Sequence, residues 1–451
     1  MKTIATQKQK GQIFIIIAIS LVVLLGSIGL AVDAGMGYLI KAKLNAAVDS
    51  ASIAAARAVT NGATQAQQTA SAIQAARAFF NANYPVGYLG GTVTFPDPVI
   101  VFNGGQVTVD TSATASVPVT FMRVMNFNLV TVAAAAEAVR KDLDMAFVMD
   151  TSGSMIPVAA TVQANAKLFL TKFNPVLDRM ALIHFSEGAV VDDPIRPVLR
   201  GFDLASMNTH INALNFGGNT NSPEGFWNAR DQLNSIALVN RSSLRVIVFF
   251  SDGAPNTFAS VFTFKKPSDC TTAGSLLSGD ASSGSLDGLY RYDQQDSTAA
   301  GKCNAGTNIG NKLTSTALPN WYNAHNPTNI VALQEFPVVV STPRVVTSAP
   351  TYANVNRASR NLLEAMAAKA RSEGIYVFSL GLGGQLTSPT GPDDEQGDVV
   401  LKCIANTADA LPRCVTAGAG QPVGIYCHAV DQNGLKPCFD KLASAILRIT
   451  K

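Results

Sequence analysis

An apolar run turns abruptly polar in the sequence Met145-Ala146-Phe147-Val148-Met149-Asp150-Thr151-Ser152-Gly153-Ser154. This pattern predicts a buried strand whose carboxyl end carries a loop at the edge of a sheet. Apolar residues then recur at helical spacing over residues 156–173, so the polar cluster lies between a strand and a helix. Open α/β sheets place their ligands at such turns, and the cluster is therefore a candidate binding site.

The cluster offers only oxygen ligands. Asp150, Ser152 and Ser154 supply one carboxylate and two hydroxyls, each two residues from the next. Oxygen ligands without nitrogen or sulfur suit a hard divalent cation such as Mg²⁺ and argue against zinc or copper. Asp and Ser are also common helix N-caps, so these residues alone leave an ordinary capped turn as the alternative.

The pattern Asp150-x-Ser152-x-Ser154 after an apolar strand resembles the metal-ion-dependent adhesion site of von Willebrand factor A (VWA) domains. Two further loops of that family follow in order along the chain. The sequence Gly-Gly-Asn-Thr-Asn at residues 217–221 matches the loop that supplies a threonine. The sequence Ser-Asp-Gly at residues 251–253, again after an apolar run, matches the loop that supplies a second aspartate.

The resemblance implies a complete ligand set. Ser152, Ser154 and, in the liganded state, Thr220 would coordinate the cation directly, whereas Asp150 and Asp252 would hold metal-bound waters. The implied cofactor is Mg²⁺, with Mn²⁺ or Ca²⁺ as alternatives. The same fold with a metal-free site also remains open.

The following sequence alternates apolar strands with amphipathic helices, which predicts a mostly parallel sheet covered on both faces. Together with the resemblance, this implies an α/β, Rossmann-like VWA domain over residues 142–451, named the head below. His184 lies inside an apolar strand and is expected to be a packed core histidine. The neighbouring apolar residues 189–191 are expected to form an antiparallel edge strand.

Residues 254–352 break this alternation, because they are rich in Ser, Thr, Gly, Asn and Pro. A segment of this length does not fit as a simple loop. We expect an insertion in the head that starts beside Asp252 and has a small core at Trp321, Tyr322 and Phe336.

The six cysteines all lie in the second half of the chain: Cys270, Cys303, Cys403, Cys414, Cys427 and Cys438. Their even number and varied spacing predict disulfides in an oxidising compartment, whereas zinc would favour paired C-x-x-C ligands. Pairing by proximity in sequence is preferred among the roughly fifteen connectivities that six cysteines allow. It joins Cys270 to Cys303, Cys403 to Cys414, and Cys427 to Cys438.

The amino-terminal region predicts a membrane anchor. Residues 13–32 contain no charge and, at about 1.5 Å per residue, can cross a bilayer core of roughly 30 Å. The lysines of residues 1–12 place this tail in the cytoplasm, and the disulfides place the rest outside. The alternatives are a cleaved secretory signal and a prepilin-type leader after Lys10-Gly11, although Ile16 stands where such a leader normally carries Glu.

Residues 33–84 are alanine-rich with apolar positions three and four apart, which predicts a long helix outside the membrane. This helix is either a stalk or packs one face on the next domain. The sequences Gly-x-Ala-Val-Asp33 and Leu-Asn-Ala-Ala-Val-Asp-Ser-Ala at residues 44–51 resemble the start of Tad-type (tight adherence) pilus-assembly proteins. Residues 426–449 resemble the end of Tad-type proteins with a VWA head, and residues 85–141 predict a small α+β module.

The sequence argues against nucleic-acid binding and against catalysis. The formal net charge is only +3 and the basic residues are scattered, so nucleic-acid binding has no support. The sequence has no Gly-x-Ser-x-Gly turn, and its four histidines lie in unrelated contexts. We therefore do not expect an enzyme.

The two resemblances imply a membrane-anchored pilus-assembly or adhesion protein of the bacterial inner membrane, with its bulk in the periplasm or at the cell surface. Its metal would accept a carboxylate from a protein partner, such as a pilus or envelope component. The alternative is an envelope scaffold or pilus tether in which the metal only stabilises the fold.

Overall fold

The computed structural model describes residues 12–59, 65–103, 106–262, 273–279, 286–294, 317–328 and 330–449. The chain divides into two compact units, Met1–Arg140 and Lys141–Lys451. The second unit begins within one residue of the start expected for the head.

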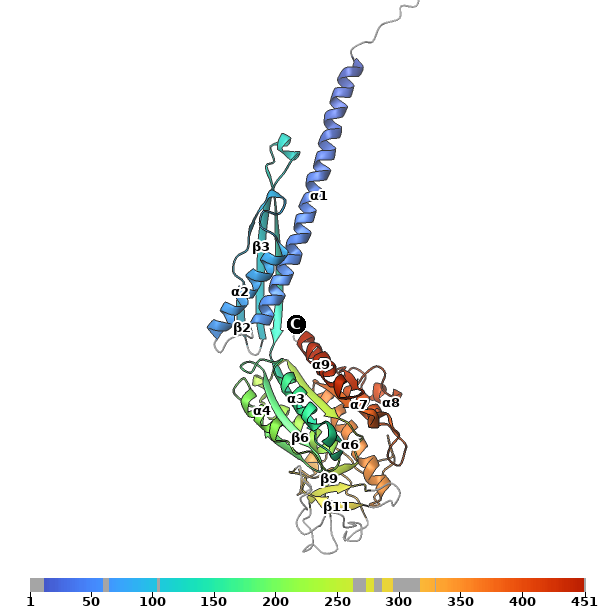
Figure 1. The fold of residues 1–451 in the computed structure, drawn as a ribbon. Coiled ribbons are helices and arrows are strands. Elements are labelled where there is room, and N and C mark those ends of the chain that lie inside the picture. The colour runs from blue at the N-terminus through green and yellow to red at the C-terminus, as the bar shows by residue number, and fades with distance from the viewer. Residues whose placement is uncertain are drawn as a thin grey trace, which may run out of the picture. The chain divides into compact units, whose positions relative to one another are not determined.

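The first unit combines two helices with a four-stranded sheet. Its helices are α1 (Gln12–Ala58) and α2 (Gln65–Asn83), and its strands are β1 (Thr92–Thr94), β2 (Val99–Asn103), β3 (Gln106–Pro118) and β4 (Leu129–Lys141). Strand β3 pairs with each of the other three and runs beside α1 (Figure 1). The sheet thus has one long central strand.

Helix α1 changes character along its length. Its amino-terminal part exposes large apolar side chains, and within the described residues it is the helix long and apolar enough to cross a membrane. From Ile40 onward, apolar residues three and four apart are buried against α2 and β3. The helix therefore packs one face on the sheet, and the segments 33–84 and 85–141 share one core.

The second unit is built on a six-stranded sheet in the order β13-β12-β8-β5-β6-β7. The strands are β5 (Leu143–Asp150), β6 (Arg179–Phe185), β7 (Ala189–Asp193), β8 (Leu244–Ser251), β12 (Ile375–Leu382) and β13 (Tyr426–Ala429). Neighbouring strands are parallel except β7, which is antiparallel to β6 at the edge. The mostly parallel sheet and its antiparallel edge strand are confirmed.

Helices cover both faces of this sheet. On one face lie α3 (Ala159–Leu170), α4 (Leu204–Ala213) and α9 (Leu435–Ile449), and on the other lie α5 (Ser222–Asn234), α6 (Tyr352–Ser372) and α7 (Gly397–Ala405). In β5, Met145, Phe147 and Met149 belong to the core on the face covered by α3, α4 and α9. Ala146 and Val148 belong to the core on the opposite face. The apolar run in the sequence is continuous because both sides of the strand are buried.

The expected insertion contributes a small antiparallel sheet, in the order β11-β10-β9. Its strands are β9 (Thr257–Val261), β10 (Ala273–Leu277) and β11 (Asp287–Tyr290). Tyr322 and Phe336 are buried, but they belong to the core shared with α5 and α6, while Trp321 is only partly buried. The expectation of a separate small core was wrong, because these aromatic side chains complete the core of the head.

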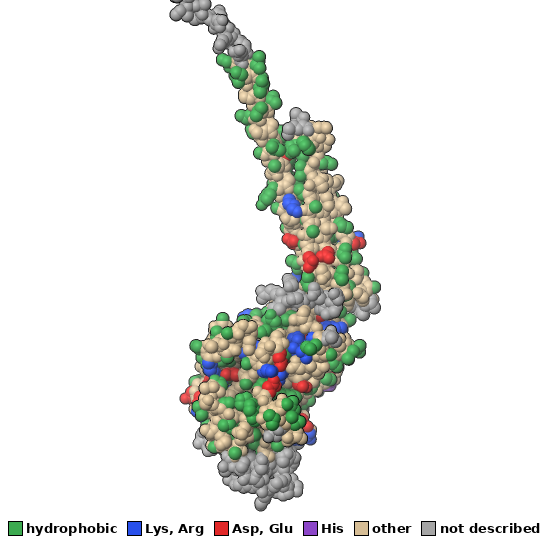
Figure 2. Space-filling model, turned by 180° about the vertical axis from the view of Figure 1, so that it is seen from behind, with side chains coloured by type: hydrophobic (Ala, Val, Ile, Leu, Met, Phe, Trp, Pro, Cys, Tyr) green, Lys and Arg blue, Asp and Glu red, His purple; other side chains and the backbone are tan. Residues whose placement is uncertain are grey.

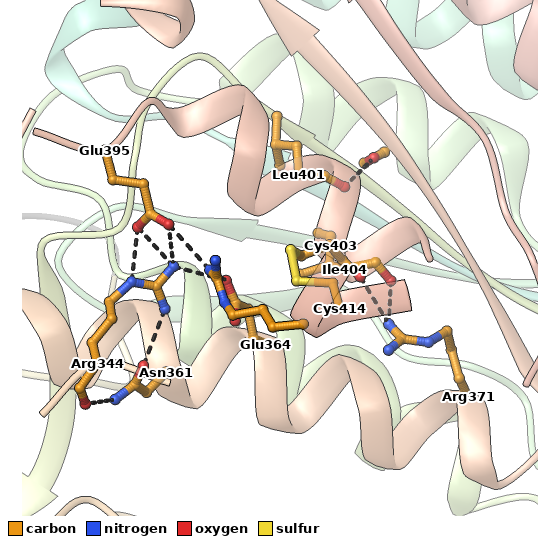
Figure 3. The surroundings of a disulfide bond; sticks show 11 residues. Arg344, Asn361, Glu364, Arg371, Glu395, Leu401, Cys403, Ile404 and Cys414 are labelled. Atoms are coloured by element: carbon orange, nitrogen blue, oxygen red, sulfur yellow. Dashed lines mark hydrogen bonds and ion pairs between the residues drawn. A yellow bond between two sulfur atoms is a disulfide. The ribbon is translucent and has the colours of Figure 1, made fainter. Parts of the chain in front are cut away.

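Two of the three expected disulfides are confirmed. Cys403–Cys414 joins α7 to the short helix α8 (Pro412–Ala417), and Cys427–Cys438 joins β13 to α9. Cys270 and Cys303 lie outside the described residues. Figure 3 shows Cys403–Cys414 near Glu364, which accepts a hydrogen bond of 2.8 Å from Arg344. Arg344 also donates to Glu395 at 2.8 Å.

Two pairs of polar side chains lie among the strands of the central sheet. His184 is buried, as expected, and its Nδ1 lies 2.6 Å from Oδ2 of Asp192 in the edge strand. Arg179 and Asp144 form a fully buried ion pair on neighbouring strands, with Nε 2.8 Å from Oδ1. Asp144 also accepts hydrogen bonds from Ser242, so this charge pair is well satisfied where β5 and β6 begin.

Candidate metal centre

The three loops singled out in the sequence meet at one edge of the central sheet. Strands β5 and β8 are parallel neighbours, so Asp150 and Asp252 follow strands that end at the same edge. Loop 151–158 connects β5 to α3, and its residues 153–158 form a 3-10 turn that starts just after Ser152. The alternation of strand and helix therefore brings residues separated by a hundred positions into contact.

Hydrogen bonds join the side chains of the first and third loops. The Ser154 hydroxyl donates to Oδ1 of Asp252 at 2.8 Å, and it lies 3.2 Å from the Ser152 hydroxyl. Asp150 is fully buried, and its Oδ1 accepts from the Ser152 amide at 2.8 Å. Its Oδ2 accepts from the Ser251 hydroxyl at 2.5 Å. Both aspartates are thus held in place by hydroxyl and amide groups.

The second loop places Thr220 at the same cluster. The Gly153 amide donates to the Gly218 carbonyl at 3.0 Å, which ties this loop to the first one. The Thr220 amide donates to Oδ1 of Asn256 at 3.0 Å, which ties it to the segment after β8. Thr220, Ser152 and Ser154 line one cavity. The structure therefore brings all five predicted side chains together: Asp150, Ser152, Ser154, Thr220 and Asp252.

Burial raises the pKa of both carboxylates in the cluster. Burial and the charge of Asp150 raise the pKa of Asp252 to about 7, although hydrogen bonds from Ser154 and Ser152 act against this rise. Burial likewise raises the pKa of Asp150. Two buried like charges destabilise each other, and a cation between them would remove the cost. With three hydroxyls nearby, the donor set suits a hard divalent cation.

Three further residues support the cluster, and none of them had a predicted role. Ser251 donates to Asp150, and Asn256 positions the Thr220 loop. Glu187 is buried under Gly218, and it accepts hydrogen bonds from Ser186 at 2.7 Å and from Asn219 at 3.3 Å. Ser186 and Glu187 follow the carboxyl end of β6, so the rule that pointed to Asp150 would also have found them.

A cavity of about 660 Å³ opens in front of the cluster. Its far wall includes Asn356 and Arg360 of α6, together with Thr390 and Asp394. Asn356 is buried, and its Oδ1 has no hydrogen-bond partner among the described residues. Arg360 donates to Glu395 and to Thr390 at 3.1 Å. The cavity thus combines the oxygen cluster with a polar wall.

Two family models match parts of the chain. Residues 145–254 match the von Willebrand factor type A domain, and residues 11–58 match the putative Flp pilus-assembly TadE/G-like family. No curated protein matches the chain significantly in sequence. The first match contains all three loops of the cluster, and the second contains the whole of α1.

Several solved structures resemble the chain at low sequence identity and low TM-score. The pilus adhesin SpaC from Lactobacillus rhamnosus GG is 14% identical in its open conformation, with a TM-score of 0.39 over 80% of this chain and 34% of its own. The PilB minor pilin from Streptococcus sanguinis is 13% identical, with a TM-score of 0.38 over 80% of both chains. The vWF domain of the type V pili tip protein Mfa5 from Porphyromonas gingivalis is 15% identical, with a TM-score of 0.39 over 70% of this chain and 98% of its own.

This chain spans about a third of the length of SpaC, and similarity this low carries no argument about function. The TadE/G-like match lies in the first unit, and the von Willebrand factor type A match lies in the second, where it includes the three loops of the cluster. The chain therefore combines a TadE/G-like segment at residues 11–58 with a region similar to the von Willebrand factor type A domain at residues 145–254.

Proposed function

We propose that the head binds a divalent cation, preferably Mg²⁺, and uses it to hold a carboxylate of a protein partner. The observation that carries this proposal is the contact chain from Ser152 through Ser154 to Asp252, with Thr220 lining the same cavity. The cavity gives a partner side chain access to these oxygens. The proposal describes a binding protein and not an enzyme.

The chemistry follows from the few charges in the cluster. Mg²⁺ prefers six oxygen ligands in octahedral geometry and usually keeps several waters. Three neutral hydroxyls and two aspartates would leave the cation electron-poor, so an incoming carboxylate would be a favourable additional ligand. The polar groups of Asn356 and Arg360 on the far wall supply hydrogen-bonding contacts for the rest of the partner.

The membrane segment suggests where this binding takes place. We propose that the amino end is cytoplasmic, that α1 crosses the bacterial inner membrane once, and that the head is exported. The lysines before the apolar run and the two disulfides of the head support this orientation. The partner would then be a pilus or envelope component, and the process would be pilus assembly or adhesion.

The test uses the full-length protein in detergent. Titration calorimetry with Mg²⁺ should show one binding site, and capture of a partner from envelope extract should require Mg²⁺ and stop in excess chelator. Asp150→Ala and Ser154→Ala should abolish both, whereas Asp409→Ala, at an exposed aspartate of the head, should preserve both. Ser154 is exposed, so its variant should remain folded. Partner capture that persists in chelator, or in Ser154→Ala, would contradict the proposal.

A second candidate function is a scaffold or tether in which the cation only stabilises the head. The mutual repulsion of Asp150 and Asp252 favours it, because a cation would relieve this cost with or without a partner. Differential scanning calorimetry separates the two candidates. A scaffold would gain thermal stability from Mg²⁺ while capturing its partner equally well with and without the cation.

A further inference from the structure

The tip of the hairpin between β3 and β4, residues 119–129, is anchored to helix α1. The amides of Thr120, Phe121 and Met122 donate to the Asp33 carboxylate at 3.1, 3.0 and 2.7 Å. The Asp33 side chain is buried in this contact. A single carboxylate thus satisfies three successive backbone donors of the hairpin tip.

The contact continues along one face of the helix at intervals of four residues. A Cβ atom added to Gly29 would lie 2.4 Å from Cβ of Phe121, and one added to Gly37 would lie 3.3 Å from Val130. One turn further on, Lys41 donates to the carbonyl of Ala133. The glycines allow the hairpin to approach the helix, and the contact extends from Gly29 to Lys41.

This contact places the hairpin tip at a defined depth. The uncharged run of α1 ends at Val32, and Asp33 is the first charged residue after it. Gly29 precedes Val32 by about 4.5 Å along the helix axis, so Phe121 lies level with the last turn of the apolar run. Figure 2 shows hydrophobic side chains covering the amino-terminal part of this helix. A bilayer around that run would reach the hairpin tip.

The side chains of the tip suit this location. Phe121, Phe127 and Leu129 are 47%, 56% and 59% exposed, although all three are large and apolar. Arg123 is exposed on the same turn, where a phosphate group would pair with it. Unpaired backbone amides are costly where water is scarce, and the Asp33 carboxylate removes this cost for three of them.

We infer that the hairpin tip is a second membrane contact, seated in the lipid interface beside the carboxyl-terminal end of the spanning helix. Phe121, Phe127 and Leu129 enter the boundary between headgroups and acyl chains, and Arg123 stays at the level of the phosphates. This contact fixes the rotation of α1 about its own axis and the tilt of the first unit. It does not depend on the metal-binding function proposed for the head.

The test is photo-crosslinking of the full-length chain in liposomes of phosphatidylethanolamine and phosphatidylglycerol. The photoreactive residue benzoylphenylalanine replaces Phe127 in one protein and Val99 in the matched control. Val99 is 60% exposed on the same sheet, but it pairs with Asp110, about 26 Å along β3 from the hairpin end. Mass spectrometry then measures the yield of lipid adducts at each position.

The expected result is a lipid adduct at position 127 that exceeds the yield at position 99 at least several-fold. Adding Asp33→Ala should lower the adduct at 127, because the tip loses its anchor. Equal yields at 127 and 99 would overturn the inference. So would a predominant adduct between two copies of the protein, which would make the tip a protein interface.

Discussion

Gly218 is a single residue on which the geometry of the candidate metal centre depends. Its φ of 79° lies in the left-handed region, and a Cβ added to it would lie 1.9 Å from the Glu187 carboxylate. Its carbonyl accepts from the Gly153 amide, so it also joins two loops of the cluster. The adjacent Gly217 differs, because an added Cβ would meet nothing within 4 Å.

Gly218→Ala should therefore weaken cation binding. A left-handed alanine costs roughly 1–2 kcal/mol, and Glu187 must also move, so the Mg²⁺ affinity should fall on the order of tenfold. Gly217→Ala should bind Mg²⁺ like the parent protein. Titration calorimetry on both variants measures the difference, and equal affinities would show that the loop does not need this conformation.

The raised pKa of Asp252 predicts that the stability of the metal-free protein depends on pH. Burial and Asp150 raise its pKa from 3.8 to about 7, so the folded state holds this proton more tightly than the unfolded chain does. The stability that the proton contributes is present below pH 3.8 and is lost as pH rises toward 7. Asp252→Asn should remove this loss.

The measurement is thermal unfolding in chelator across this pH range. The melting temperature of Asp252→Asn should rise relative to the parent as pH increases. Asp409→Asn is the control, because hydrogen bonding to Thr407 lowers the pKa of Asp409 and its contribution changes only at lower pH. A constant difference between Asp252→Asn and the parent would contradict the electrostatic account of the cluster.

At the scale of elements, the order of strands and helices assembles the candidate metal centre. Strands β5 and β8 are adjacent and parallel, so two loops a hundred residues apart meet at one edge. Strand β13 is different, because it is only four residues long and lies at the opposite edge from β7. The Cys427–Cys438 disulfide ties this short strand to α9.

Removing that disulfide should release the β13 edge. Its cysteines are 11 residues apart, and loops of this length contribute about 2–3 kcal/mol of stability. The double variant Cys427→Ser with Cys438→Ser should lose about this much, with faster hydrogen exchange in β13 and α9. The matched control, Cys403→Ser with Cys414→Ser, opens a loop of the same separation and should affect α7 and α8 instead. Unchanged exchange in β13 would refute the prediction.

At the scale of the whole molecule, the two units have separate hydrophobic cores. The first core combines α1, α2 and the four-stranded sheet, whereas the cores of the second lie on the two faces of the six-stranded sheet. The described disulfides and the candidate metal centre all belong to the second unit. Cation binding and reduction should therefore act on one unit only.

Calorimetry of the full chain in detergent should show two unfolding transitions. At a hundredfold excess over its dissociation constant, Mg²⁺ should stabilise one of them by about 2.7 kcal/mol. A reducing agent should lower that same transition and leave the other in place. A single transition, or equal shifts of both, would show that the two units unfold together.

Local patterns in the chain were enough to predict the strand and loop at Met145–Ser154, the apolar span of α1, two disulfides and the five side chains of the cluster. Each depends on residues near one another in sequence, or on a family pattern that fixes the order of the loops. The contact of Asn256 with the Thr220 loop, the shared burial of Tyr322 and Phe336, and the docking of the hairpin on Asp33 emerged only in three dimensions. The spacing of apolar residues shows which face of an element will be buried, and the residue type shows which side chains need a polar partner. The element that covers the face, or the group that pairs with the side chain, comes from a distant part of the chain.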